Sequence, residues 1–151
     1  MLKEHIPERS HAMFWHVVLP IVFGAVIYLV FRSRHLLVFS WVDLVGFGDL
    51  INSLRSQIPT SLRLPDWIIF SLPDALWMYA IGMFYLILWK GIKSPVRYFW
   101  YAIAPLLGIG GEIGQLIGFV PGTFCLVDLS LCTAVLTITV FIQTKRINHE
   151  K

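Results

Sequence analysis

The stretch GEIGQLIGFVPGTFCLVD, residues 111–128, decides the fold of this chain. It holds the end of one apolar segment and the start of another, joined by a Pro-Gly turn that has no charged residue. An apolar segment of about 20 residues is long enough to cross the hydrocarbon core of a bilayer as a helix. Four segments of roughly that length occur in the sequence, at residues 13–31, 67–89, 98–119 and 124–143. The sequence therefore predicts an all-α, polytopic membrane bundle with four transmembrane helices.

The composition supports the same fold class. Hydrophobic residues make up 57% of the 151 residues and charged residues only 14%, which is well outside the range of soluble globular proteins. The apolar segments leave room for one integral membrane domain, residues 1–151, and for no separate soluble catalytic domain. The net charge of +3 arises from basic residues beside the apolar segments, where they contact anionic lipid. We therefore expect membrane lipids as partners, and no nucleic acid.

The distribution of lysine and arginine predicts the orientation in the membrane. With the N-terminus inside, the basic residues of the inside segments outnumber those outside by 8 to 4, as the positive-inside rule requires. The inside set is Lys3, Arg9, Lys90, Lys93, Arg97, Lys145, Arg146 and Lys151, and the outside set is Arg32, Arg34, Arg55 and Arg63. The prediction is a multi-pass protein of the cell membrane with both termini in the cytoplasm.

Residues 36–58 belong to none of the four spans. Their apolar part is short and is interrupted by Asp43, which favours an interfacial or re-entrant segment over a crossing. The tetrapeptide GFGD at residues 46–49 fits the Gly-x-Gly-Asp pattern of intramembrane aspartic proteases, and Asp49 could share a proton with Asp74 as a dyad. Because a four-letter match with two glycines carries little information, a loop turn is the better interpretation.

Three of the predicted helices carry a carboxylic acid at membrane depth, namely Asp74, Glu112 and Asp128. Burying such an acid costs a few kcal/mol unless it is protonated, paired or facing water, so acids in spans usually mark function. At a rise of about 1.5 Å per residue, the three lie about 12, 13 and 10 Å from the outer ends of their helices. Gln115 follows Glu112 by three positions and shares its helix face. We predict that these four residues form a site that binds a ligand or holds protons.

Each of these residues also has a structural interpretation. Glu112 and Gln115 can form a hydrogen-bonded pair between helices. Aspartate is favoured at helix starts, so Asp128 or Asp74 can serve as a helix cap. Pro73, directly before Asp74, predicts a kink or an unwound turn in the second span.

A strip of glycines runs along the third predicted helix. Gly110, Gly114 and Gly118 repeat at a spacing of four and lie nearly opposite Glu112. Small residues at that spacing let a neighbouring helix approach closely, so we predict helix packing on this face. The sequence leaves open whether the protein forms a homo-oligomer or a hetero-oligomer.

No metal site, cofactor or catalytic residue is predicted. The sequence contains no nucleophile motif and no phosphate-binding loop. Its histidines sit at the chain ends and beside the first span, without the spacing of metal ligands: His5, His11, His16, His35 and His149.

Glu112, Gln115, the Pro-Gly turn after them and Asp128 resemble the pattern of the VanZ-like membrane protein family. That pattern is Glu-x-x-Gln, a Pro-Gly turn and an aspartate that opens the last helix. Asp74, preceded by proline, is similar to the family's aspartate in the corresponding helix, and the resemblance covers residues 66–141. It implies a four-span bacterial envelope protein. Members of the family are linked to resistance to glycopeptide antibiotics such as teicoplanin.

The chain departs from the family pattern at three positions. Thr123 replaces the arginine that commonly follows the Pro-Gly turn, Met78 replaces a histidine, and Cys132 replaces an asparagine. These departures leave an acid-rich site without its usual basic and amide partners.

Three functions compete at this point. The leading hypothesis is a non-enzymatic membrane protein whose outward-facing polar pocket binds a lipid-linked envelope ligand or a glycopeptide. A second is a membrane enzyme that uses two of the acids as general acid and base on a lipid headgroup or peptide. A third is a small proton-coupled carrier, although such carriers place their acid in the first span, which has none here.

Overall fold

The structure of this protein is a computed structural model. It describes the backbone of residues 5–59 and 61–149 and the side chains of residues 9–59 and 61–142. Lys3 and Lys151, used above for the orientation, lie outside the described residues, and Lys145 and Arg146 lie where only the backbone is described.

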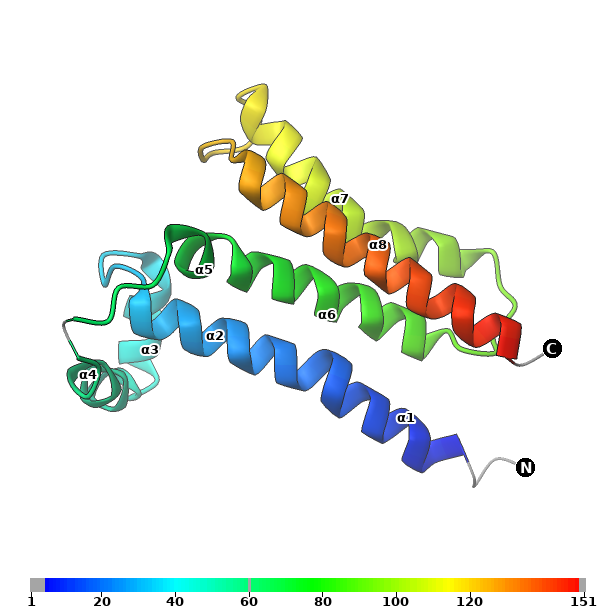
Figure 1. Cartoon of the computed structure of the whole chain (residues 1–151), viewed down its shortest axis with the longest axis horizontal. Coiled ribbons are helices and arrows are strands. Elements are labelled where there is room, and N and C mark those ends of the chain that lie inside the picture. The colour runs from blue at the N-terminus through cyan, green and yellow to red at the C-terminus, as the bar shows by residue number, and fades with distance from the viewer. Residues whose placement is uncertain (1–4, 60, 150–151) are drawn as a thin grey trace.

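All the secondary structure of the described residues is helical, which confirms the predicted all-α class. In chain order the helices are α1 (His5–Met13), the π-helical turn η1 (Phe14–Val18), α2 (Leu19–Phe31), α3 (Leu37–Leu44), α4 (Gly48–Ser56), α5 (Asp66–Phe70), α6 (Leu72–Leu88), α7 (Val96–Leu116) and α8 (Leu126–His149). The continuous rod of α1, η1 and α2 and the long helices α6, α7 and α8 run roughly along one axis (Figure 1).

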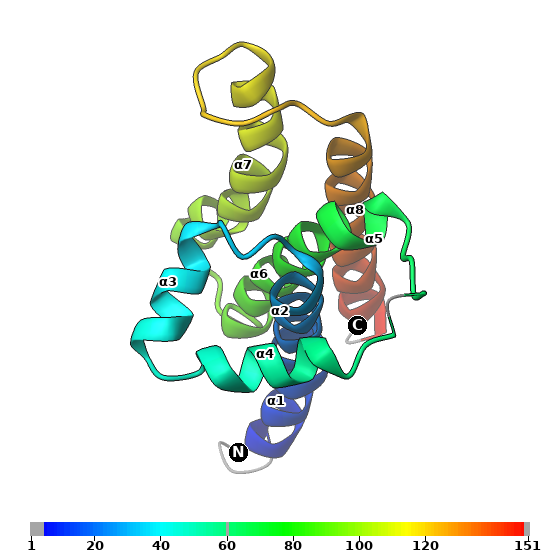
Figure 2. The same ribbon diagram turned by 90° about the vertical axis from the view of Figure 1, so that its left-hand side faces the viewer.

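Helix α6 is the centre of the bundle, because it packs against α2, α7 and α8 (Figure 2). Its buried side chains are mostly small or flexible, and Ala75, Ala80 and Met83 are fully enclosed. Ala80 and Met83 form one core cluster with Val17 of η1. A central helix with small side chains allows three neighbours to come close at the same time.

Three glycines mark the closest approaches between helices. A Cβ atom on Gly24 of α2 would lie 2.8 Å from the indole nitrogen of Trp77, and one on Gly108 of α7 would lie 3.1 Å from Met78. A Cβ atom on Gly82 of α6 would lie 3.2 Å from a methyl group of α8. A side chain at any of these three positions would hold two helices apart.

The second predicted span is interrupted where proline indicated a break. Helix α5 ends at Phe70 and α6 begins at Leu72, with Ser71 between them. Pro73 lies in the first turn of α6, where its missing N–H removes no helical hydrogen bond. The predicted kink at this point is confirmed, and it places Asp74 in the first turn of the restarted helix.

Residues 36–58 form two short helices, α3 and α4, whose axes bend by 115° at their junction. The pair is fastened to the end of α2 by Arg55, which donates from Nε to the carbonyl oxygen of Val30 (2.8 Å) and from Nη2 to that of Arg32. Burial, and secondarily the charge of Arg34, lower the pKa of Arg55 below its ordinary value. Arg55 therefore satisfies carbonyl groups that α2 leaves free at its C-terminus.

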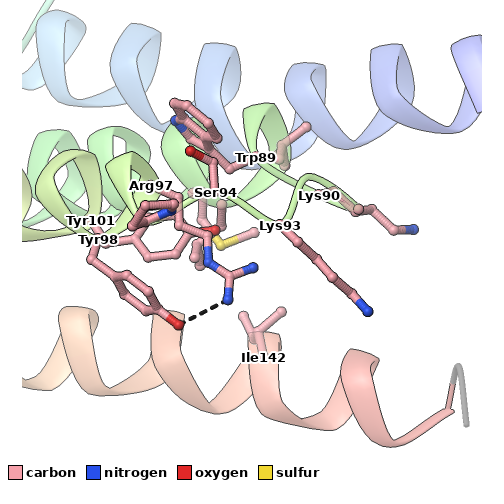
Figure 3. Close-up of a pocket in the computed structure, with 13 residues that line it drawn as sticks. Trp89, Lys90, Lys93, Ser94, Arg97, Tyr98, Tyr101 and Ile142 are labelled. Atoms are coloured by element: carbon pink, nitrogen blue, oxygen red, sulfur yellow. Dashed lines mark hydrogen bonds between the residues drawn. The ribbon is translucent and has the colours of Figure 1, made fainter.

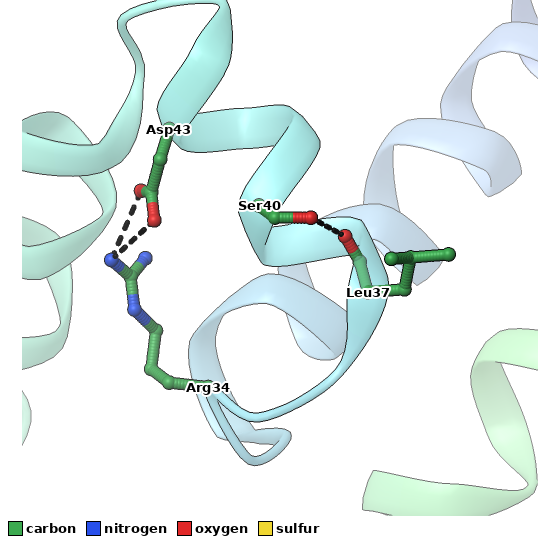
Figure 4. Close-up of polar contacts among 4 residues, drawn as sticks. All are labelled: Arg34, Leu37, Ser40 and Asp43. Atoms are coloured by element: carbon green, nitrogen blue, oxygen red, sulfur yellow. Dashed lines mark hydrogen bonds and ion pairs between the residues drawn. The ribbon is translucent and has the colours of Figure 1, made fainter.

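Phe39 is the apolar anchor of this helix pair. It is 1% exposed, and the guanidinium carbons of Arg34 and Arg55 each lie 5.2 Å from its ring centre. Arg34 in turn forms an ion pair with Asp43 at 3.0 Å (Figure 4). By contrast, Leu44 at the bend is 86% exposed, so the pair presents an apolar outer surface.

The two ends of the bundle carry different elements (Figure 1). Helix α1 begins, and α8 ends, at the same end as the α6–α7 loop. The α3–α4 pair, α5 and the α7–α8 loop lie at the opposite end, which we call the acidic end because it holds the three acids.

One helix among the described residues, Arg9–Phe31, is long and apolar enough by itself to cross a membrane. The bent pair α3 and α4 meets the same criterion only if it counts as one broken span. Leu72–Leu88 and Leu126–Ile142 are apolar but shorter.

The anchoring role of Phe39 predicts the result of a substitution. Phe39→Ala should lower the free energy of unfolding by about 3 kcal/mol, because it leaves a cavity and removes two cation–π contacts. The measurement is denaturant-induced unfolding of the purified protein in detergent micelles. Phe47→Ala is the matched control, since Phe47 lies in the same helix pair and is 55% exposed. Equal losses in the two variants would contradict the anchoring role.

Candidate functional site

The three acids predicted from the sequence lie at the acidic end of the bundle, on three different helices. Asp74 is in the first turn of α6 and Asp128 is in the first turn of α8. Glu112 precedes the last residue of α7, Leu116, by four positions. All three side chains are half-buried.

The carboxyl groups are close enough for their charges to interact. The charges of Asp128 and Glu112 both act on Asp74, and the charge of Arg32 acts on it with the opposite sign. The thiol of Cys132, one turn after Asp128 and almost fully buried, also lies within the field of all three acids. We call Asp74, Glu112, Asp128 and Arg32 the charged cluster.

Glu112 has a defined structural partner. Its Oε2 accepts a hydrogen bond of 3.0 Å from the backbone N–H of Cys125, the residue directly before α8. The carboxylate therefore joins the end of α7 to the start of α8. Glu112 thus has the structural hydrogen bond between helices that was one interpretation of the sequence, but its partner is a backbone N–H and not Gln115.

Gln115 packs against the Pro-Gly turn. Gly122 has a φ of +142°, and a Cβ atom there would lie 2.8 Å from the amide of Gln115. A residue with a side chain at position 122 would be strained and would also displace the amide. Gln115 thus supports the loop that carries Cys125 to Glu112.

The glycine strip divides into different roles. Gly118 lies beyond α7 with a φ of +75°, and the N–H of Phe119 donates to the carbonyl of Gly114 at 2.8 Å. This is a Schellman ending, so Gly118 terminates the helix, and its predicted place in a helical packing strip is corrected. The atoms nearest to a Cβ on Gly110 or on Gly114 belong to Leu106 and Val120 of the same segment. The predicted packing role of Gly110 and Gly114 stays a prediction.

Asp128 holds one of the two unsatisfied atoms that the described part of the cluster contains. Its Oδ1 is completely buried and has no hydrogen-bond partner among the described residues. Buried polar atoms are nearly always hydrogen-bonded, so an exception needs a proton, a water molecule or a ligand to explain it. The cluster therefore offers an acceptor that the rest of the described chain does not use.

Arg32 is also a member of the cluster. From the sequence, it contributed only to the predicted orientation in the membrane. Its Nη2 donates to the carbonyl of Phe70 at 2.9 Å, and its guanidinium lies over the rings of Tyr28 and Phe70 at 5.1 and 4.7 Å. Its Nε is buried without a hydrogen-bond partner among the described residues. The feature of the sequence that could have indicated this role of Arg32 is its position at the outer end of the first predicted span, the same end as the acids.

The cluster does not have the geometry of a metal site or of a protease dyad. No group of three His, Cys, Asp or Glu side chains among the described residues could hold a metal ion. Asp49 is exposed in the first turn of α4, and its charge is not among those that act on Asp74. The structure therefore gives no support to a pair formed by Asp49 and Asp74.

Comparison with family models, curated proteins and solved structures finds no match to this chain.

The contact of Glu112 with Cys125 predicts different effects for two substitutions. Glu112→Ala should lower the free energy of unfolding by about 1–2 kcal/mol, because the N–H of Cys125 loses its acceptor. Glu112→Gln keeps a side-chain oxygen and should cost less. Amide hydrogen exchange at residues 125–129 should accelerate in the alanine variant alone. Unchanged exchange in that variant would show that the carboxylate does not hold the start of α8.

Proposed function

We propose that the protein is an integral membrane protein in which the rod ending with α2, the α5–α6 segment, α7 and α8 each cross the bilayer. Large apolar side chains are exposed on all of these rods, including Phe23, Leu88, Leu106 and Phe141. Exposed apolar surface of this extent is costly in water and is expected against lipid. The rod that contains Arg9–Phe31 supports the proposal most directly.

We further propose that both termini are cytoplasmic and that the acidic end faces outward. The start of α1, the end of α8 and the α6–α7 loop lie at the same end of the fold, which supports this topology (Figure 1). The loop carries Lys90 and Lys93, and basic loops are retained in the cytoplasm.

This topology predicts the accessibility of two loops in intact cells. In a chain whose Cys125 and Cys132 are replaced by alanine, Thr123→Cys should react with a membrane-impermeant maleimide. Ser94→Cys, in the α6–α7 loop, should react only after lysis, because it lies on the cytoplasmic side. Labelling of both positions before lysis would contradict the proposed crossing of α7.

For the charged cluster we propose binding of an envelope ligand, through its hydroxyl, amide or amine groups, from the outer side. The observation that carries this proposal is the buried Oδ1 of Asp128, which has no partner in the described part of the chain. A donor from a ligand would satisfy it with a charge-assisted hydrogen bond. Arg32 can bind an acidic or carbonyl group of the same ligand beside Asp74.

The resemblance to the VanZ-like family gives this proposal a testable ligand class. We propose that the protein acts in the bacterial envelope and lowers sensitivity to glycopeptide antibiotics of the teicoplanin type. In this reading Arg32, from the end of α2, supplies the positive charge that Thr123 does not provide after the Pro-Gly turn.

Binding is preferred over catalysis because of the position of Glu112. A general acid or base must be free to exchange its proton with a substrate. The carboxylate of Glu112 instead accepts from the N–H of Cys125, and the charge of Arg32 acts on Asp74. These contacts suit fixed acceptors better than a mobile proton pair.

The proposed role of Asp128 predicts a loss of function without a loss of folding. A bacterial host that produces the wild-type protein should tolerate more teicoplanin than a host with an empty vector. Asp128→Asn should return tolerance to the empty-vector level, because the variant lacks the charged acceptor. Asp66→Asn is the control, since Asp66 is an exposed acid at the start of α5. Protein levels are compared by immunoblot, and equal tolerance in both variants would contradict the proposal.

A further inference from the structure

The end of the bundle opposite the acidic end contains a cavity of about 550 Å³. It is partly open and is lined by the end of α6, the α6–α7 loop, the first turns of α7, and α8 at Ile142 (Figure 3). Its inner wall is apolar and includes Met83 and Ile87, which belong to the core. A volume of this size falls within the range of about 300–1,000 Å³ that small-molecule sites occupy.

The polar lining of this cavity has one sign of charge. Lys90, Lys93 and Arg97 all line it, and none of its described lining residues is acidic. Arg9 adds a fourth basic residue nearby, because its guanidinium donates to the carbonyl oxygen of Lys90 at 2.9 Å. Concentrated positive charge within a partly apolar wall favours an anion with an apolar body.

Arg97 is held in position by neighbouring groups. It donates from Nη2 to the hydroxyl oxygen of Tyr98 at 2.9 Å and from Nη1 to the carbonyl of Ile92 at 3.3 Å. Its Nε is buried without a hydrogen-bond partner among the described residues, and so is the indole nitrogen of Trp89. Both atoms are enclosed by protein, so what Arg97 offers to an anion in the cavity is the charge of its guanidinium.

The surroundings of the cavity distinguish a lipid from a free anion. Ile92, Val96, Tyr98 and Phe99 all expose large apolar surfaces on the loop and the first turn of α7. Acyl chains can lie along these side chains while a headgroup phosphate enters the basic cavity. A free phosphate ion would make no use of this apolar rim.

We propose that this cavity binds the phosphate of an anionic phospholipid from the cytoplasmic leaflet, with Lys93 and Arg97 as its main ligands. The proposal rests on the membrane insertion proposed above and is independent of the charged cluster. Basic pockets between membrane helices on the cytoplasmic side are suited to anionic headgroups.

The test uses the full-length protein purified in a mild detergent. Native mass spectrometry measures the binding of phosphatidylglycerol and of phosphatidylcholine with the same acyl chains. The wild type should bind phosphatidylglycerol more tightly. Lys93→Gln and Arg97→Gln should each weaken that binding about fivefold, since one basic residue near anionic lipid contributes about 1 kcal/mol. Arg63→Gln, an exposed position outside the cavity lining, should leave it unchanged.

Three outcomes would overturn the proposal. The first is equal binding of the two lipids by the wild type, and the second is an equal loss in Arg63→Gln, which would indicate a general effect of net charge. The third comes from thermal unfolding, in which phosphatidylglycerol but not inorganic phosphate should stabilise the wild type. Equal stabilisation by inorganic phosphate would assign the cavity to a free anion.

Two further measurements keep the result independent of folding and of the proposed function. Lys93 is exposed, so Lys93→Gln decides the matter if Arg97→Gln fails to fold. Asp128→Asn should bind phosphatidylglycerol as the wild type does. The proposed role in teicoplanin tolerance and the proposed lipid binding can therefore be contradicted independently of each other.

Discussion

Close packing around α6 is the constraint on which the rest of the structure depends. Helices α2, α7 and α8 all contact α6, and this is possible because its buried residues include Ala75 and Ala80. Gly24 and Gly108 bring the neighbouring backbones in from either side. The charged cluster is a consequence, since the charges of Glu112 and Asp128 can act on Asp74 only if α7 and α8 both lie close to the start of α6. A larger side chain at these contacts would separate the helices and the acids together.

The acidic end combines groups that hold the fold with groups that remain available. Glu112 fixes the start of α8 through Cys125, and Arg55 fixes the end of α2 through the carbonyl groups of Val30 and Arg32. These contacts set the positions of two atoms that have no hydrogen-bond partner in the described part of the chain, the Oδ1 of Asp128 and the Nε of Arg32. The supporting contacts of the acidic end are complete within the chain, so the positions of these groups are set by the fold itself.

The sequence predicted the helices well and the contacts between them poorly. The apolar segments 13–31, 67–89, 98–119 and 124–143 are each largely helical, because length and hydropathy are local properties of the chain. The break at Ser71 followed from Pro73 for the same reason. The partners of Gly24 and Gly108, in contrast, depend on how helices cross, and sequence spacing does not give the crossing. The contacts that Gly24 and Gly108 make could therefore not be predicted from glycine spacing along one helix.

The site itself could be predicted only in part, for a related reason. Depth along each helix can be counted in residues, and that count placed Asp74, Glu112 and Asp128 at one end. Arg32 entered the cluster through the rotation of α2 about its axis and through contacts with Tyr28 and Phe70, which no spacing rule specifies. Its guanidinium changes the chemistry that the acids offer. Three carboxyl groups alone would favour a cation, whereas a carboxyl cluster beside a fixed guanidinium is matched to a ligand that carries both donor and acceptor groups.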